Sequence, residues 1–352
     1  MRKTSFVLLI AILTVSLLTA RTIPLPEHSN PVVLMTTLCL ADKVIPLVNL
    51  SRPEAVEVNN DNAYIVDGVH VYIYSLTDFK LKKKFGRMGE GPQEFKNWII
   101  LYVQPDHLFI NSPNKISYFN LEGKFIKEIK SKYIWGRFKP LDESFVGHSY
   151  VFEGATRYEG VYIFDADFSK VKELSRKKHF FQKEQYINRI EERPPFFYIV
   201  GEKIFVDDPK GIIHVFDKDG NELYTIDAKL EPLKFTAADK DRYVKWFTRT
   251  PQRKQTYERR KNFFRFPKYF PPIRMFHVVD NKIYILTFKE KDNKNECVIW
   301  ASDGTFIKRA WLPVGPFEES IIPLFYTIKN DKLYRIVENE EDQQWELHIS
   351  AI

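Results

Sequence analysis

One stretch of this 352-residue chain superficially resembles the glycine-rich loops that cradle phosphate groups. It reads Gly86, Arg87, Met88, Gly89, Glu90, Gly91, Pro92, Gln93, Glu94 and Phe95. In nucleotide-binding loops, spaced glycines let backbone N–H groups approach a phosphate, and the N-terminus of a following helix adds positive potential. Here an extended segment follows instead of a helix. We therefore expect Gly86, Gly89, Gly91 and Pro92 to form a tight structural crossing and Phe95 to enter the core.

The polar side chains of this stretch are the candidates for binding a ligand. They are Arg87, Glu90, Gln93 and Glu94. The alternative is that the charged members of this set pair with one another across the tight loop. The sequence leaves both interpretations open.

A second candidate site is a strongly basic segment. The whole chain carries +7, residues 1–20 carry +2 and residues 234–274 carry +10, which leaves −5 for the rest. Thr236 and Asp239 form a capping box, which predicts a helix from there to about Arg249. The residues that follow supply the candidate patch for an anionic partner: Arg253, Lys254, Arg259, Arg260 and Lys261.

Three interpretations of this patch remain open. The segment is either a solvated lid, a surface for an anionic phospholipid, glycan or acidic protein, or a nucleic-acid site. The last is considered because Tyr257, Phe263 and Phe264 lie among the basic residues. Residues 1–20, discussed below, predict export, and an exported protein seldom meets nucleic acid. We therefore expect no nucleic-acid partner.

The elements that must position these residues are short strands in a repeat. An apolar run followed by an Asp, Asn or Gly turn recurs at residues 71–75, 116–120, 161–165, 213–217, 297–301 and 346–350. Positions 75, 120, 165, 217 and 301 are 45, 45, 52 and 84 residues apart. A second strand precedes each copy, and inner strands are clearest at residues 196–200, 275–279 and 325–328. Repeats of this length predict the four-stranded blades of a β-propeller.

The count of repeats predicts six blades, the last of which lacks its outer strand. We expect residues 43–50 to complete that blade and to close the ring, because closure removes exposed sheet edges. Pro46 fits an outer strand, where a missing N–H group costs little. The long spacing predicts a partly helical basic insertion at residues 228–273, and a smaller insertion lies at residues 177–193.

The loop at residues 86–95 resembles the loop of the NHL-type six-bladed propellers, in which spaced glycines, Gly-Pro and an acidic residue or Gln precede Phe. It is closest to a group of exported bacterial six-bladed propellers, which residues 270–273 also resemble. The resemblance covers about residues 42–352 and implies the same closed fold. NHL proteins often repeat the loop, whereas this chain carries the full loop at one blade boundary.

Some NHL-like propellers bind a catalytic metal in the central channel through histidines of several inner strands. Here His277 is the histidine that falls clearly in an expected inner strand, and the chain has neither a Gly-x-Ser-x-Gly nor a His-Glu-x-x-His motif. We expect Asp67 and Asp207, which follow equivalent strands, to bind turn amides. We therefore predict no catalytic residues, no metal and no cofactor, and the sequence leans against an enzyme without deciding the matter.

The N-terminus predicts export. Arg2 and Lys3 precede an apolar run at residues 6–18, and Ala20 offers a cleavage site, so residues 1–20 are typical of a signal peptide. A retained N-terminal membrane anchor is the alternative. Residues 21–41 would be a linker, and we expect no membrane span in the mature chain. Whether Cys39 and Cys297 form a disulfide stays open.

The leading hypothesis is a monomeric, periplasmic or extracellular propeller that binds or scaffolds an unidentified ligand or protein partner without catalysis. The alternative is a propeller hydrolase or lyase that uses the central channel.

Overall fold

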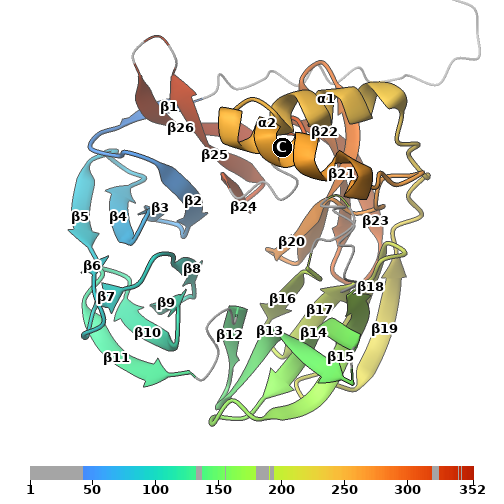
Figure 1. Ribbon diagram of the computed structural model, residues 1–352. Coiled ribbons are helices and arrows are strands. Elements are labelled where there is room, and N and C mark those ends of the chain that lie inside the picture. The colour runs from blue at the N-terminus through green and yellow to red at the C-terminus, as the bar shows by residue number, and fades with distance from the viewer. Residues whose placement is uncertain are drawn as a thin grey trace, which may run out of the picture. The chain divides into compact units, whose positions relative to one another are not determined.

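The protein folds into six four-stranded antiparallel sheets that are arranged around a central axis (Figure 1). The structure is a computed structural model and describes residues 43–352, except 132–136, 155, 180–189, 191–193, 319–324, 340 and 342. The predicted all-β, six-bladed propeller is confirmed. The predicted signal peptide and linker lie outside the described residues.

In each blade the first strand lies nearest the axis and the fourth lies outermost (Figure 1). The first three blades consist of β2 (Pro53–Val58), β3 (Asn62–Asp67), β4 (His70–Ser75) and β5 (Leu81–Phe85); β8 (Ile100–Val103), β9 (His107–Ser112), β10 (Lys115–Asn120) and β11 (Phe125–Lys130); and β12 (Arg137–Leu141), β13 (Ser144–Glu153), β14 (Thr156–Phe164) and β15 (Lys170–His179).

The last three blades follow the same order. They consist of β16 (Phe197–Val200), β17 (Lys203–Asp207), β18 (Ile212–Phe216) and β19 (Glu222–Asp227); β20 (Met275–Val279), β21 (Lys282–Lys291), β22 (Lys294–Ala301) and β23 (Phe306–Leu312); and β24 (Tyr326–Lys329), β25 (Lys332–Asn339), β26 (Gln344–Ala351) and β1 (Lys43–Leu47). The repeated run found in the sequence is therefore the third strand of each blade.

Both faces of each sheet are buried, because every blade packs between two neighbours. In β3, Ala63 and Ile65 belong to a cluster shared with the sixth blade. Tyr64 and Val66 point the other way and belong to a cluster shared with the second blade. Alternate residues of a strand point to opposite faces. This is why the middle strands are apolar throughout instead of alternating with polar residues.

The ring is closed by β1, as predicted. This strand pairs antiparallel with β26, from Lys43 opposite Ile349 to Leu47 opposite Trp345. Ile45 and Leu47 are buried in the cluster between the sixth and first blades. Pro46 is exposed on this outermost strand, where no further strand needs its missing N–H group.

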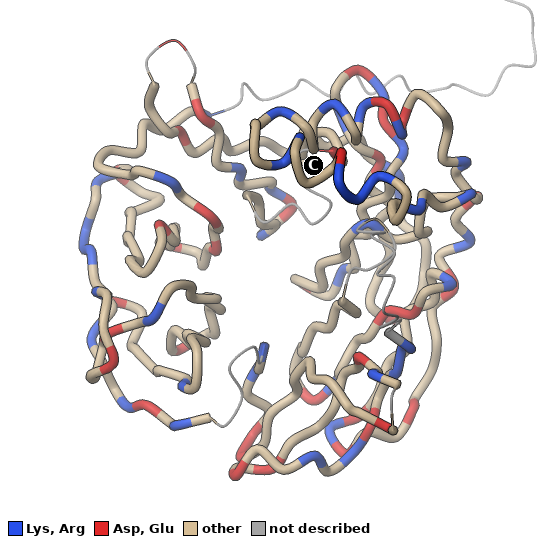
Figure 2. The backbone as a smooth tube through the Cα atoms, in the orientation of Figure 1, with Lys and Arg blue, Asp and Glu red and all other residues tan. Residues whose placement is uncertain are grey.

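The predicted insertion lies between β19 and β20 and is helical. It contains α1 (Ala237–Phe247), α2 (Pro251–Arg260) and the short 3₁₀ helix η1 (Lys261–Phe263). The capping box of Thr236 and Asp239 begins α1, as predicted. The second helix was not predicted from the sequence. Figure 2 shows Lys and Arg along both helices.

An aromatic cluster fixes the insertion to the fifth blade. Its buried members are Ile190, Phe235, Tyr243, Phe247, Phe264, Phe270, Phe288 and Phe317. Arg242 of α1 adds ion pairs to Glu290, at the end of β21, and to Glu318. Both carboxylates lie at the end of the propeller where the inner strands begin. The helices are therefore held at that end.

Two expectations fall partly on residues that the structure does not describe. Residues 177–179 of the smaller insertion belong to β15, and most of the rest of that insertion lies outside the described ranges. Cys297 is buried in β22, and burial raises the pKa of its thiol. Cys39 is not described, so its pairing with Cys297 stays open.

We predict that shortening a buried side chain of the closing strand β1 destabilises the whole propeller. Leu47 is 3% exposed, and Leu47→Ala should lower the free energy of unfolding by about 2–4 kcal/mol through lost burial and a cavity. Val44 is 46% exposed on the same strand, so Val44→Ala should change it by less than about 0.5 kcal/mol. Urea unfolding measures both, and equal effects would contradict the closure.

Candidate functional site

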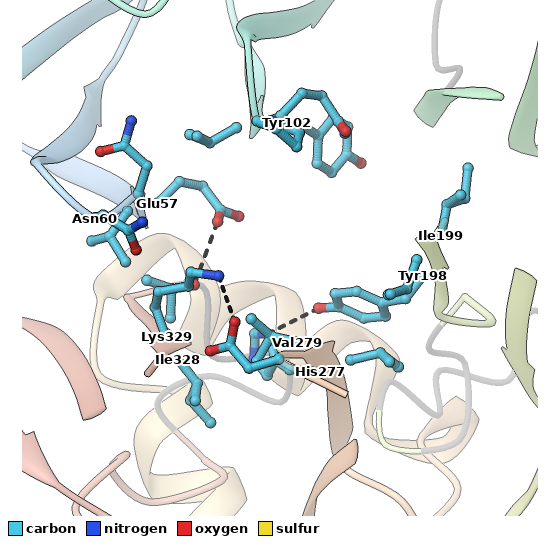
Figure 3. Close-up of a pocket in the computed structure, with 18 of the residues that line it drawn as sticks. Glu57, Asn60, Tyr102, Tyr198, Ile199, His277, Val279, Ile328 and Lys329 are labelled. Carbon is cyan, nitrogen blue, oxygen red and sulfur yellow. Dashed lines mark hydrogen bonds and ion pairs between the residues drawn. The ribbon is translucent and has the colours of Figure 1, made fainter. Parts of the chain in front are cut away.

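A cavity of about 540 Å³ lies on the axis, where the six inner strands face one another. Each inner strand contributes a polar or aromatic side chain to its lining: Glu57 from β2, Tyr102 from β8, Lys139 from β12, Tyr198 from β16, His277 from β20, and Thr327 and Lys329 from β24. Figure 3 shows several of these side chains around the common space. The prediction that His277 lies in an inner strand is confirmed.

Glu57 provides a carboxyl group to the cavity. Its Oε2 accepts a hydrogen bond from the Thr327 hydroxyl at 3.4 Å (Figure 3). The side chain is partly buried, and it lines the cavity. Burial raises the pKa of this carboxyl group to about 7, although the charge of Lys139 and the Thr327 hydrogen bond act in the opposite direction.

Lys139 provides an ammonium group among aromatic rings. Its Nζ donates to the Phe197 carbonyl at 3.2 Å and lies 4.1 Å from the ring centroid of Tyr198 and 4.7 Å from that of Tyr102. Burial lowers the pKa of this amine to about 8, against the attraction of Glu57. No ion pair between Lys139 and Glu57 is found among the described residues.

His277 is a neutral imidazole with spare hydrogen-bonding capacity. Its Nδ1 lies 3.0 Å from the Tyr198 hydroxyl (Figure 3). Burial, and secondarily the charge of Lys139, lowers the pKa of His277 to about 3. The side chain is 8% exposed, and its Nε2 has no hydrogen-bond partner in the part of the chain that the structure describes. A neutral imidazole nitrogen is a good donor or acceptor, so this atom is available to a ligand.

The mouth of the cavity lies at the turns that follow the inner strands. Asp280 follows β20 and pairs with Lys329 at the end of β24. The Asn330 backbone donates to Asp280, and its side chain donates to Asn60, which follows β2. This network joins the fifth, sixth and first blades and fixes the rim of the mouth.

The cavity therefore combines an acid, an amine and a neutral imidazole within rigid walls. Groups with pKa values displaced toward neutrality are common at functional sites. Such a set can bind a polar molecule and can exchange protons near pH 7. Within the described ranges, no group of three or more His, Cys, Asp or Glu side chains is placed to hold a metal ion.

The loop at residues 86–95 lies at the outer part of the ring, between β5 and β11 (Figure 1). Its two short strands, β6 (Arg87–Met88) and β7 (Glu94–Phe95), pair in parallel. Phe95 is fully buried between the first two blades, as predicted. Arg87 Nε donates to Glu94 at 2.8 Å, and Glu90 pairs with Lys96, while Gln93 is exposed. A ligand role for Arg87, Glu90, Gln93 and Glu94 stays a prediction.

A buried lysine that the sequence analysis missed holds this loop. Lys115 of β10 donates to the Gly91 carbonyl at 2.7 Å and pairs with Glu128 at 3.2 Å. Gly86 and Gly89 have φ of 86° and 152°, as the crossing requires. Gly91, unlike Gly86 and Gly89, does not have a positive φ. Its N–H group instead donates to the Glu94 carboxylate, which helps hold the pKa of Glu94 low.

Asp67 and Asp207 bind backbone amides, as predicted. The Asp67 carboxylate accepts from the Ser51 and Arg52 amides at 2.8 and 2.9 Å. Asp207 accepts from the Phe196 amide at 2.8 Å. Each carboxylate thus fixes the chain that leads into the inner strand of its own blade, which is a structural role.

The five basic residues of the predicted patch are all exposed. They lie on α2 and on the residue after it: Arg253, Lys254, Arg259, Arg260 and Lys261. Residues seven apart share a helix face, so Arg253 aligns with Arg260. Arg253 also lies over the ring of Trp246 at 5.1 Å, and Lys261 pairs with Glu258. Anion binding by this patch stays a prediction.

No protein-family model matches the chain, and no curated protein does. Among solved structures, BamB from Moraxella catarrhalis is 9% identical in sequence to this chain, with a TM-score of 0.31. The match covers 84% of this chain and 71% of BamB. The β-propeller domain of Myceliophteria thermophila Cps50 (Swd1) is 11% identical in sequence, with a TM-score of 0.40. That match covers 88% of this chain and 99% of the Cps50 chain. None of the helices in the described ranges has the length and apolar character needed to cross a membrane.

We predict that Gly86 tolerates a side chain less well than Gly91. A Cβ at Gly86 would lie 2.4 Å from the Val69 carbonyl oxygen, and the φ of 86° is strained for alanine. Gly86→Ala should therefore lower the free energy of unfolding by about 1–3 kcal/mol. At Gly91 the new atom meets only the movable Glu94 side chain, so Gly91→Ala should cost less than about 1 kcal/mol. Chemical denaturation compares the two, and the reverse order would refute the role of the backbone at Gly86.

We also predict that Glu57 makes the fold less stable as the pH rises. Its folded pKa of about 7 exceeds the ordinary value of 4.5, so folding disfavours the ionised form. This cost is absent below pH 4.5 and complete above pH 7. Between pH 5 and pH 7.5, wild-type protein should lose about 1–2 kcal/mol relative to Glu57→Gln. Urea unfolding at both pH values measures this, and identical pH profiles would show that Glu57 ionises freely.

Proposed function

We propose that this protein is an exported propeller that binds or scaffolds an anionic partner through the exposed basic residues of α2 and the adjoining Lys261. The six-bladed fold is consistent with a binding or scaffolding role. The signal-like residues 1–20 and the resemblance of residues 86–95 to a loop of exported bacterial propellers support export. We expect the protein to act as a monomer without a cofactor.

The observation that carries this proposal is the exposure of five basic side chains on one short, anchored segment. Glu258 is the only acidic residue of α2, and it pairs with Lys261. The rest of the chain outside residues 1–20 and the insertion carries −5. Such a charge separation orients the molecule toward an anionic surface or polymer.

The attachment of the helices makes the patch a defined surface. Tyr243 and Phe247 of α1 are buried in the aromatic cluster, and Tyr257 of α2 packs against that cluster. Because Tyr257 attaches α2 to the aromatic cluster, the basic residues of α2 keep their positions before any partner binds. Preorganised groups lose less entropy on binding than groups on a flexible tail.

We predict that changing Arg253, Lys254, Arg259, Arg260 and Lys261 to Gln abolishes binding to anionic vesicles and acidic polysaccharide. Exposed charges contribute little to stability, so Tm should change by only a few degrees. Binding of the wild-type protein to phosphatidylglycerol vesicles, alginate or heparin should weaken as salt rises, while phosphatidylcholine vesicles should not bind. The vesicle and polysaccharide arms distinguish a lipid from a glycan partner.

A matched control removes five other exposed lysines, on the outer strands and turns of the first two blades: Lys82, Lys83, Lys84, Lys124 and Lys127. This variant has the same net charge as the first and should retain binding. Equal loss in both variants would mean that net charge alone matters. If wild-type protein ignores both probes at low salt, the anionic-partner proposal fails.

A second function, acid–base cleavage in the channel by a hydrolase or lyase, is favoured by one observation. Glu57 and Lys139 have pKa values of about 7 and 8 and line one cavity. The same polysaccharide incubations test it through the release of reducing ends or of ultraviolet-absorbing double bonds. Product release that Glu57→Gln abolishes would replace the binding proposal with this one.

A further inference from the structure

A carboxyl group and an amine, those of Glu57 and Lys139, both line the axial cavity. Glu57 accepts one long hydrogen bond, from Thr327 at 3.4 Å. Lys139 donates one, to the Phe197 carbonyl at 3.2 Å. Among the described residues these two side chains form no ion pair, although each shifts the pKa of the other. The two groups therefore lie apart, on the first and third blades, and each has one hydrogen-bond partner among the described residues.

Both groups retain unused hydrogen-bonding capacity. A carboxylate offers about four acceptor sites and an ammonium group three donors. Charged groups held in protein surroundings are costly unless they are paired. A ligand that brings a cation to Glu57 and an anion to Lys139 relieves both costs at once. A neutral polyol would form hydrogen bonds with them but would bring no opposite charge to either group.

The rest of the wall suits the same kind of molecule. Tyr102 and Tyr198 flank Lys139 and present ring faces. His277 of β20 also lines the cavity, and its buried Nε2 lacks a hydrogen-bond partner in the described structure. Concave sites combine a mainly apolar or aromatic lining with a few polar groups that fix the orientation of the ligand. A cavity of about 540 Å³ has room for an amino acid or a short peptide.

We propose that the axial cavity is a binding site for a small zwitterion, a free amino acid or a short peptide, whose ammonium group pairs with Glu57 and whose carboxylate pairs with Lys139. Tyr198 and His277 line the space between and hydrogen-bond the polar backbone of the ligand. The aromatic faces of Tyr102 and Tyr198 contact its side chain.

This site is independent of the basic patch on α2. The mouth of the cavity lies at turns that follow the inner strands, such as that at Asp280. The insertion precedes the inner strand β20 and is fixed to Glu290 and Glu318 at the other end. Binding of vesicles or polysaccharide can therefore fail while zwitterion binding holds, and the reverse.

The first experiment screens the full-length exported protein against the twenty amino acids and alanine di- and tripeptides by calorimetric titration at low salt. The best binder is then compared with its N-acetylated form, its amidated form and the doubly blocked form, with glucose as a neutral polyol. We expect each block to weaken binding by about tenfold or more, because each removes one charge-assisted contact. A preference for single amino acids or for peptides identifies the source of the zwitterion.

The second experiment pairs each block with one variant. In Glu57→Gln the N-acetyl group should no longer weaken binding, and in Lys139→Gln amidation should no longer do so. Matched controls remove exposed charges elsewhere, Glu338→Gln on β25 and Lys294→Gln at the start of β22, and should behave as wild type. Circular dichroism confirms that all four variants fold.

The proposal is overturned if no zwitterion in the panel binds, or if glucose or the doubly blocked form binds as tightly as the free form. It is also overturned if N-acetylation of the ligand weakens binding to Glu57→Gln, and amidation weakens binding to Lys139→Gln, as much as each does with wild-type protein. Because the comparison of blocked ligands uses wild-type protein, a variant that fails to fold does not remove the test.

Discussion

Every blade of this propeller has two apolar faces, and the structure depends on covering both of them. A blade is stable only between two neighbours, so the row of blades must close into a ring. The pairing of β1 with β26 provides that closure. It joins the first described segment to the last and places Ile45 and Leu47 against the first blade. The central cavity follows, because six inner strands around an axis cannot all meet.

The closure also creates part of the candidate site. Glu57 lies on the first blade and Thr327 on the sixth, 270 residues apart in the chain, and their hydrogen bond crosses the seam of the ring. The rim contact from Asn330 to Asn60 crosses the same seam. The environment of Glu57 thus depends on the contact between the first and sixth blades. Stability of the ring and the chemistry of the channel are coupled through one interface.

The sequence predicts the blades better than the channel, for a physical reason. Middle strands are buried on both faces, so they contain unbroken apolar runs such as residues 63–66 of β3 and residues 71–74 of β4, and the sequence analysis recognised these. Inner strands contain charged residues beside apolar ones, as the exposed strands of the surface do. From the sequence alone, Glu57 and Lys139 therefore could not be distinguished from exposed charged residues. The second helix, α2, lacks buried residues and hence an apolar period, although Thr250 and Pro251 supply a start signal. Lys115 was missed because its partner, the Gly91 carbonyl, is close only after folding.

The direction of the chain decides how the two candidate sites relate. All inner strands start at one end of the propeller and finish at the other. An insertion between a fourth strand and the next first strand, such as that between β19 and β20, therefore grows at the end where inner strands begin. The short turns after the inner strands leave the mouth of the cavity uncovered by it. Charges on the insertion can change without altering the channel, because the Arg242 ion pairs and the aromatic cluster hold the helices away from the mouth.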